Sequence, residues 1–172
     1  MSSNKISDWF FQYNKDIYHF LLYYVGSGDI EDLVQEVFIR AIKGFDDYQW
    51  ESSPKTWLFS IARNVGRDEI RKRARKRFRM NKDNFLSYHE STSEMTPEKV
   101  LQLNEKNKQL YKAIRSLKSN YRDVIILRAI KEQSVSETAA ILNWNENKVR
   151  ITYHRALKTL ERKKEEIDFE RE

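Results

Sequence analysis

The sequence contains no cysteine, which excludes disulfide scaffolds, thiolate metal sites, cysteine nucleophiles and redox relays. It has only four glycines and two prolines, a composition that favours helices over turn-rich sheets. No stretch approaches the roughly 20 consecutive apolar residues that a membrane-spanning helix needs. The first residues also lack the cationic start and apolar core of a signal peptide. We therefore expect a helical protein that works in the cytoplasm.

The excess of positive charge is small but concentrated. Lysine and arginine outnumber aspartate and glutamate by 32 to 26, so a polyanionic partner is plausible. Whether the chain has a surface for such a partner depends on where these charges lie. One basic run extends from Arg63 to Arg79. Within it, Asn64, Arg67, Arg71 and Arg75 are spaced by three, four and four residues, which places them on one face of a helix. That density attracts phosphates, although a solvated helix end would have the same composition.

Apolar residues at helical spacing predict three helices in the first half, over 8–24, over 30–45, and from Pro54 into the basic run. Asp29 is a good N-cap for the second helix, and Ser53 before Pro54 is typical of the start of the third.

The helical period is lost in a polar stretch, which predicts two small domains. We expect an all-α fold with a first domain over 1–79, a flexible linker over 80–97 and a second domain over 98–172. Thr96 and Pro97 predict the restart of a helix, and Ser119 is expected to cap another.

The segment from Ser134 to Leu160 predicts a helix-turn-helix, with a first helix over about 135–142. Ser134 and Glu137 match the capping box, in which each side chain satisfies a backbone N–H. Asn143 stands where a left-handed residue would end the first helix, and Asn145 can cap the second. A helical hairpin with a solvated basic face is the alternative.

In the second helix of this motif, one apolar face would pack on the domain and the opposite face would suit a major groove. The outward residues are Asn147, Lys148, Ile151, Thr152, Arg155 and Lys158, with Arg150 and His154 on the flanks.

Aromatic residues also occur beside the basic run. Aromatic faces together with cations are what unstacked single-stranded bases bind. Trp57 is expected in the core, whereas Trp50, between polar residues, is expected to be exposed; Tyr48 is undecided between the two.

Three blocks of this chain together resemble the extracytoplasmic-function (ECF) sigma factors, the small two-domain promoter-specificity subunits of bacterial RNA polymerase. The blocks are DIEDLVQEVFIRAIKGFDDY, SSPKTWLFSIARNVGRDEIRKR and YRDVIILRAIKEQSVSETAAILNWNENKVRITYHRALKTL, which stand in the family's order and spacing. The resemblance covers nearly the whole chain.

The resemblance implies three sets of functional residues. Docking on the clamp helices of the largest polymerase subunit would involve Asp32, Leu33, Gln35, Glu36 and Phe38. The promoter −10 element, including a flipped base, would be bound by Trp50, Glu51, Ser52, Ser53, Asn64, Arg67, Arg71, Lys72 and Arg75. The −35 duplex would be read by Lys148, Arg150, Ile151, Thr152, His154, Arg155 and Lys158.

The chain departs from the family pattern at several positions. Glu132 replaces a common glycine, Thr138 a usual aliphatic residue and Asn143 a frequent turn glycine. Ser119-Asn120 stands where proline is common, and Ile151 where a small polar residue is frequent. Asparagine tolerates left-handed geometry, so the turn is expected to survive.

The expected partners are core RNA polymerase, promoter DNA and an anti-sigma factor of the kind that is often membrane-anchored. No cofactor and no metal are expected. A stand-alone helix-turn-helix regulator is the alternative, although a loop and basic helix for single strands have no use in a duplex reader. An enzyme is disfavoured because the chain lacks a glycine-rich phosphate loop, metal-ligand spacing and any nucleophile constellation.

Overall fold

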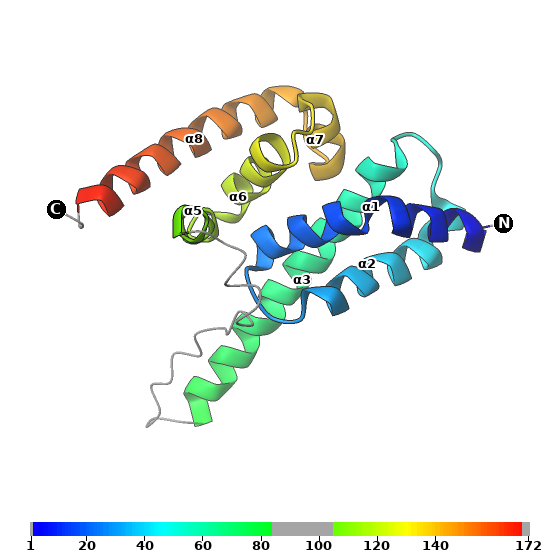
Figure 1. Ribbon diagram of the computed structural model, residues 1–172, viewed down its shortest axis with the longest axis horizontal. Coiled ribbons are helices and arrows are strands. Elements are labelled where there is room, and N and C mark those ends of the chain that lie inside the picture. The colour runs from blue at the N-terminus through cyan, green and yellow to red at the C-terminus, as the bar shows by residue number, and fades with distance from the viewer. Residues whose placement is uncertain (1, 84–104, 170–172) are drawn as a thin grey trace.

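The structure is a computed structural model that describes residues 2–83 and 105–169, and every regular element in these ranges is helical (Figure 1). The expected all-α fold is therefore confirmed for the described residues. In chain order the elements are α1 (Ser2–Val25), α2 (Ile30–Gly44), the short 3₁₀-helix η1 (Phe45–Asp47), α3 (Pro54–Asp83), α5 (Glu105–Arg115), α6 (Ser119–Ile125), the π-helical turn η2 (Ile126–Ile130), α7 (Val135–Leu142) and α8 (Glu146–Phe169).

The predicted helix starts at α2 and α3 are confirmed by their caps. The Asp29 carboxylate accepts a hydrogen bond from the backbone N–H of Asp32 at 3.2 Å. Ser53 Oγ accepts one from the backbone N–H of Thr56, also at 3.2 Å. Each contact satisfies a donor that the first turn of a helix leaves without a backbone partner.

Three predicted boundaries are wrong. α1 begins at Ser2 rather than at Asp8, less than two turns earlier, because the buried Ile6 continues the apolar face beyond Trp9. α3 continues to Asp83, four residues into the predicted linker, in a stretch rich in good helix formers. Lys118 rather than Ser119 is the N-cap of α6. The predicted helix start at Thr96-Pro97 and the rest of the linker lie outside the described residues.

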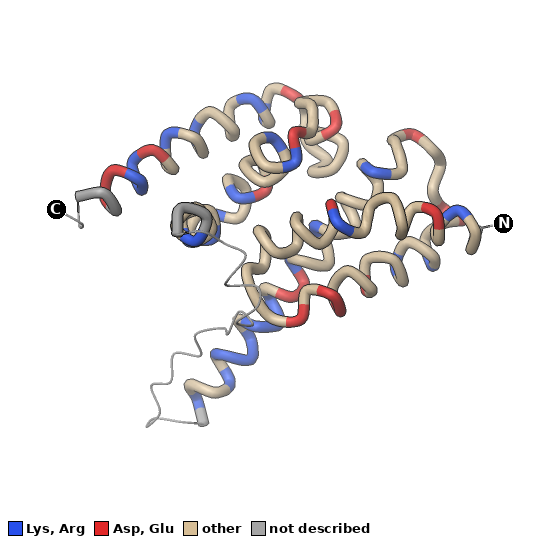
Figure 2. Tube along the Cα trace, in the orientation of Figure 1, with Lys and Arg blue, Asp and Glu red and all other residues tan. Residues whose placement is uncertain are grey.

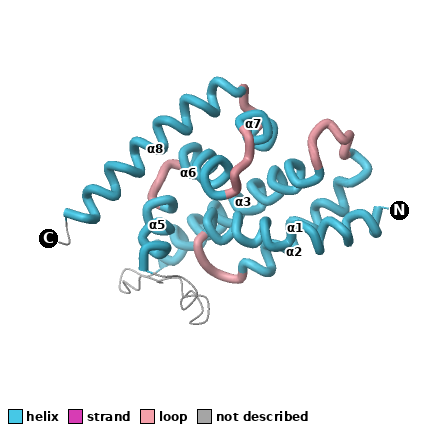
Figure 3. Tube along the Cα trace, turned by 45° about the horizontal axis from the view of Figure 1, so that its top comes forward, coloured by secondary structure: helices cyan, strands magenta, loops and turns pink. Residues whose placement is uncertain are grey.

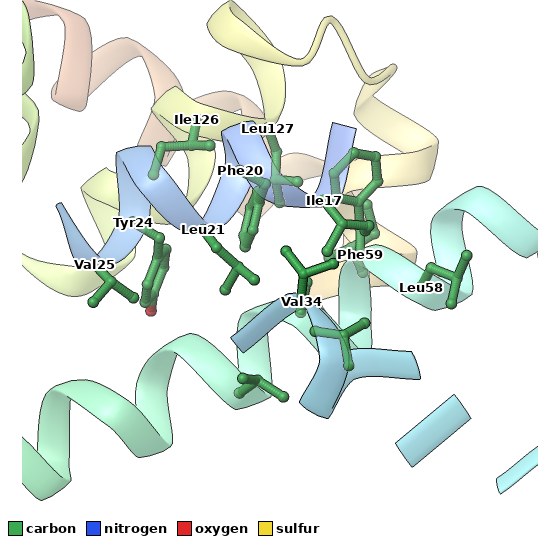
Figure 4. Packing of buried hydrophobic residues seen from close by; sticks show 14 of the residues in the cluster. Ile17, Phe20, Leu21, Tyr24, Val25, Val34, Leu58, Phe59, Ile126 and Leu127 are labelled. Atoms are coloured by element: carbon green, nitrogen blue, oxygen red, sulfur yellow. The ribbon is translucent and has the colours of Figure 1, made fainter. Parts of the chain in front are cut away.

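Helices α1, α2 and α3 pack together in the first half of the chain, around apolar side chains that are fully excluded from solvent. Phe20 of α1 packs against Phe59 of α3 with ring centroids 5.5 Å apart, and Figure 4 shows both rings among the buried side chains of this cluster. Gly66 permits the close approach of α1 and α3, because a Cβ at this position would lie 2.7 Å from the Tyr24 ring.

The second half of the chain packs directly on the first. Helices α5 and η2 lie against α1, and α7 lies against α3. Ile126 and Leu127 join the same buried cluster as Phe20, as Figure 4 shows. Tyr23 of α1 stacks on Tyr111 of α5 with ring centroids 4.3 Å apart. Among the described residues the two halves therefore share one apolar core.

A buried ion pair also joins the two halves. Arg63 Nε of α3 donates to the Asp123 carboxylate of α6 at 3.1 Å, with the two side chains 13% and 1% exposed. Burial raises the pKa of the Asp123 carboxyl, and the Arg63 guanidinium opposes that rise. The neighbouring Arg122 places its guanidinium 5.7 Å from the centre of the Tyr24 ring. Because the residues that make these contacts are far apart in sequence, the contacts depend on the tertiary arrangement alone.

Candidate nucleic-acid interface

The basic part of α3 projects away from the helical core, and Figure 2 shows lysine and arginine along its outer half. Asn64, Arg71, Lys72 and Arg75 are exposed, and Arg67 is half-buried. The structure thus brings the predicted α3 residues to one side of one continuous helix. Their cationic side chains lie close enough together to follow a phosphate backbone.

Two other arginines of the basic run form ion pairs within the protein. Arg63 pairs with Asp123, as described above. Arg73 pairs with Glu69 at 2.8 Å and donates to the Ser27 carbonyl at 2.6 Å. Their charges stabilise the fold, so the run contributes fewer cations to an outer surface than its composition indicates.

The loop between η1 and α3 lies near the start of α1 (Figure 1, Figure 3), and its Tyr48 and Trp50 contact Trp9 of that helix. Trp50 is 52% exposed and takes a left-handed backbone conformation with φ of 60°. Tyr48 is buried, stacks on Trp57 with centroids 4.5 Å apart, and donates its hydroxyl to the Ser52 carbonyl. The predictions that Trp50 is exposed and that Trp57 packs in the core are both confirmed.

This loop also encloses a small hollow of about 220 Å³. Its lining residues are Asp47, Tyr48, Gln49, Glu51, Ser52 and Trp57. Carboxylate, amide and carbonyl groups at its edge offer hydrogen-bond partners, while the two rings offer apolar faces. A flat, polar-edged ring such as an unstacked base matches this combination of groups.

The helix-turn-helix prediction is confirmed in its local geometry. Ser134 Oγ accepts from the Glu137 backbone N–H at 3.0 Å, and the Glu137 carboxylate accepts from the Ser134 N–H at 2.8 Å. Asn143 ends α7 in the left-handed conformation with φ of 55°. The Asn145 side chain accepts from the Lys148 N–H at 2.8 Å and so caps α8. These caps fix the angle between the two helices.

Helix α8 buries one face and exposes the other. Val149 and Ala156 are fully buried, whereas most of the predicted outward residues are exposed and Thr152 is half-buried. The exposed members of the predicted set are Lys148, Arg150, Ile151, His154, Arg155 and Lys158. Arg150 pairs with Glu146 at 3.0 Å in an exposed position, so it remains available to an external partner.

The connection into this motif shows why the resemblance expects a glycine at residue 132. Glu132 has φ of 53°, in the left-handed region that glycine enters without steric cost. The departure from the family pattern therefore places a strained residue just before α7.

The predicted polymerase-docking residues on α2 are divided between surface and core. Asp32 and Gln35 are exposed, Leu33 and Glu36 are half-buried, and Phe38 is buried at 5% exposure. Glu36 accepts from Arg40 at 2.8 Å. Phe38 packs edge-on against Phe10, with ring centroids 5.0 Å apart, because its position belongs to the apolar stripe. The Phe38 ring therefore packs between α2 and α1 instead of being exposed to a partner.

Two exposed apolar residues on α2 were missed by the sequence reasoning. Ile39 and Ile42 are 44% and 56% exposed. They lie four and seven residues after Gln35, so they continue the same helix face. Each is an apolar residue outside the stripe that forms the core, and this is the sequence signal that indicates an exposed apolar contact. The two side chains extend the candidate docking surface.

Within residues 2–83 and 105–169, no group of three or more histidine, aspartate or glutamate side chains could hold a metal ion. None of the helices in those ranges is both long enough and apolar enough to cross a bilayer.

A capped helix-turn-helix beside a long basic helix is typical of DNA-binding proteins that act in transcription. Two protein-family models match the chain: Sigma-70 region 2 over residues 10–77, and Sigma-70, region 4 over residues 107–160.

Curated relatives agree with these matches over most of the chain. The ECF RNA polymerase sigma factor SigX of Bacillus subtilis is 37% identical over 150 residues, covering 86% of this chain and 77% of the relative. The ECF RNA polymerase sigma-E factor of Escherichia coli K12 is 31% identical over 145 residues, covering 81% and 76%. The chain belongs to the ECF RNA polymerase sigma factors, which are transcription initiation factors.

Solved structures support the fold. The sigma factor RpoE from Bartonella quintana, in complex with the anti-sigma factor NepR, has a TM-score of 0.70 at 22% identity, covering 94% of this chain and 97% of that one. CnrH, in complex with the cytosolic domain of CnrY, has a TM-score of 0.68 at 20% identity, covering 92% and 86%.

Proposed function

We propose that this sigma factor divides promoter recognition between its two halves, with residues 1–79 binding polymerase and the −10 element and residues 98–172 binding the −35 element. One observation carries the proposal: the chain presents two exposed surfaces of different chemistry, one on the Trp50 loop and α3 and one on α8. The exposed Trp50 beside the basic face of α3 suits single-stranded bases, whereas the capped α7–α8 motif suits a duplex major groove.

The proposal assigns a role to each surface. Exposed Asp32 and Gln35 of α2 would contact the polymerase, with Ile39 and Ile42 beside them. The loop around Trp50 would hold a base that has left the −10 duplex, which favours strand opening. Phosphodiester synthesis would belong to the polymerase, so the chain itself would carry out no catalysis. It would act in the cytoplasm, where bacterial RNA polymerase works.

We also propose an anti-sigma factor as a partner. The support is that two similar structures contain protein partners: RpoE of Bartonella quintana was solved with the anti-sigma factor NepR, and CnrH with the cytosolic domain of CnrY. A search for a stoichiometric co-purifying protein tests this proposal, and repeated failure to find one would contradict it.

Run-off transcription tests the main proposal directly. Purified core RNA polymerase would transcribe a genomic DNA library with and without this protein, and the 5′ ends would be sequenced. We expect new start sites that share two spaced upstream motifs. Duplex binding without polymerase and without new starts would instead support a stand-alone regulator.

Replacing Arg71 and Arg75 together with alanine is expected to weaken promoter binding at all sequences. Both side chains are exposed on α3, and phosphate contacts carry no sequence information. Holoenzyme binding to forked promoter DNA, measured from about 50 to 200 mM salt, should lose about 0.7 from its logarithmic salt slope for each single-strand phosphate contact removed. Exposed Lys43 on α2 provides a matched control when replaced with alanine. A loss confined to certain −10 sequences would contradict the phosphate assignment.

A further inference from the structure

The N-terminal turns of α1 reach the aromatic loop that the proposed function assigns to the −10 element. Trp9 of α1 is 8% exposed and lies at the centre of an aromatic cluster. Its ring contacts Phe45 at 5.7 Å, Tyr48 at 6.1 Å, Trp50 at 5.7 Å and Trp57 at 6.2 Å between centroids. One side chain outside the loop therefore touches rings at both ends of the loop and at its tip.

The conformation of Trp50 needs such support. A left-handed backbone is costly for a bulky residue and persists only where the surroundings hold it. Trp50 is the exposed residue of the cluster, and its ring contacts Tyr48 at 4.8 Å, Trp9 at 5.7 Å and Phe45 at 6.3 Å between centroids. Trp9 meets it edge-on at an interplanar angle of 72°, an arrangement that aromatic pairs favour.

A lysine from the same helix completes the arrangement. Lys5 lies one turn before Trp9 and places its ammonium group 4.9 Å from the centre of the Trp50 ring. Lys5 is itself exposed, so this side of the ring borders solvent. A base that displaces the ammonium group from this face and stacks on the ring would leave Lys5, on its long flexible side chain, beside the phosphate of that base.

We propose that Lys5 and Trp9 belong to the site that captures an unstacked promoter base. Trp9 is a positioning residue that orients the Trp50 ring, and Lys5 contacts the phosphate beside the captured base. Both residues precede residue 10, where the match to Sigma-70 region 2 begins, so they add to the matched segment. The inference rests on the proposed function of the Trp50 loop.

The test uses reconstituted holoenzyme and a promoter located by the start-site mapping described above. Transcription is compared between that promoter and a panel with each −10 base changed in turn. The variants for Trp9 are Trp9→Leu, which removes the ring, and Trp9→Phe, which keeps one. Phe11→Leu on the same helix is the matched control, because Phe11 is 76% exposed and lies outside the cluster. Trp50→Ala serves as the positive control.

Trp9→Leu should reduce discrimination at one −10 position by roughly fivefold or more, since the stacking ring positions the base whose edge the polar groups of the loop would read. Trp9→Phe should restore most of the discrimination, and Phe11→Leu should not change it. Discrimination at the −35 element should stay constant in all four variants. If Trp9→Leu fails to fold, as judged by circular dichroism, Trp9→Met fills the space without a ring and takes its place.

Lys5 is tested by binding of a single-stranded −10 oligonucleotide to the holoenzyme. Lys5→Ala should flatten the logarithmic salt slope by about 0.7 without changing base preference, and Lys5→Arg should retain the wild-type slope.

The outcomes separate this inference from the proposed function. If Trp50→Ala loses base discrimination but the folded Trp9 variant keeps it, the positioning role is wrong and the loop assignment stands. If Trp50→Ala also keeps it, the loop assignment fails and the inference fails with it. An unchanged salt slope in Lys5→Ala would overturn the phosphate contact.

Discussion

Replacing Arg63 with alanine is expected to lower the free energy of unfolding by about 3 kcal/mol, because it leaves a buried carboxylate without its cation. Asp123 is 1% exposed, and its paired guanidinium comes from the other half of the chain. Urea denaturation at pH 8, followed by circular dichroism, measures the loss. The unfolding midpoint should shift to lower urea, because the half that contains α5 to α8 loses a contact with α3.

The loss should depend on pH in a defined direction. Burial already raises the pKa of Asp123, and removing Arg63 removes the charge that opposes this rise most strongly. A carboxyl with a raised pKa in the folded state stabilises the fold below its unfolded pKa and loses that contribution as pH rises. The Arg63→Ala variant should therefore be closer to wild type at pH 5 than at pH 8.

Two further variants make this expectation specific. The double variant Arg63→Ala, Asp123→Asn buries no charge, so it should recover part of the stability and lose the added pH dependence. Arg40→Ala is the control, because Arg40 is also paired, with Glu36 and Asp68, but in a more exposed place, where each such pair contributes about 1 kcal/mol or less. Equal losses in Arg63→Ala and Arg40→Ala would contradict a buried ion pair.

Replacing Arg150 with alanine is expected to weaken discrimination at the −35 element by about 1–3 kcal/mol, or roughly 5- to 150-fold. Arg150 projects from the first turns of α8, where a recognition helix contacts base edges. Its exposed partner Glu146 costs little to displace. Competition binding of the holoenzyme to the mapped promoter and to −35 variants measures the change.

Lys164→Ala is the matched control for Arg150→Ala. Lys164 is an exposed cation of the same helix, fourteen residues away, which places it about 21 Å along the axis. It should leave −35 discrimination unchanged. A loss of binding in Arg150→Ala that is equal at every sequence would show that Arg150 contacts phosphate instead of a base.

The features that the sequence predicted well are those determined by residues close together along the chain. The caps at Asp29, Ser53 and Asn145 each act within three residues, and the Ser134–Glu137 capping box does the same. The separation of Trp57 from Trp50 also followed from neighbouring residues, since an apolar stripe surrounds one and polar residues flank the other.

The features that sequence did not predict depend on tertiary packing. Arg63 and Asp123 are sixty residues apart, and nothing near either residue indicates the other. The same holds for Trp9, whose four aromatic neighbours become visible only when α1 lies beside the loop. Phe38 carried a functional expectation from the resemblance, but its place on the apolar stripe of α2 buries it.

The core that the two halves share also matters while the chain is being made. The face of α1 that carries Tyr23 and Tyr24 is covered by Tyr111 and Arg122, which leave the ribosome much later. At translation rates of about 5–20 residues per second, the interval from residue 83 to residue 127 lasts roughly 2–9 s. During those seconds the nascent first half displays apolar surface, so chaperones have a defined interval in which to bind it.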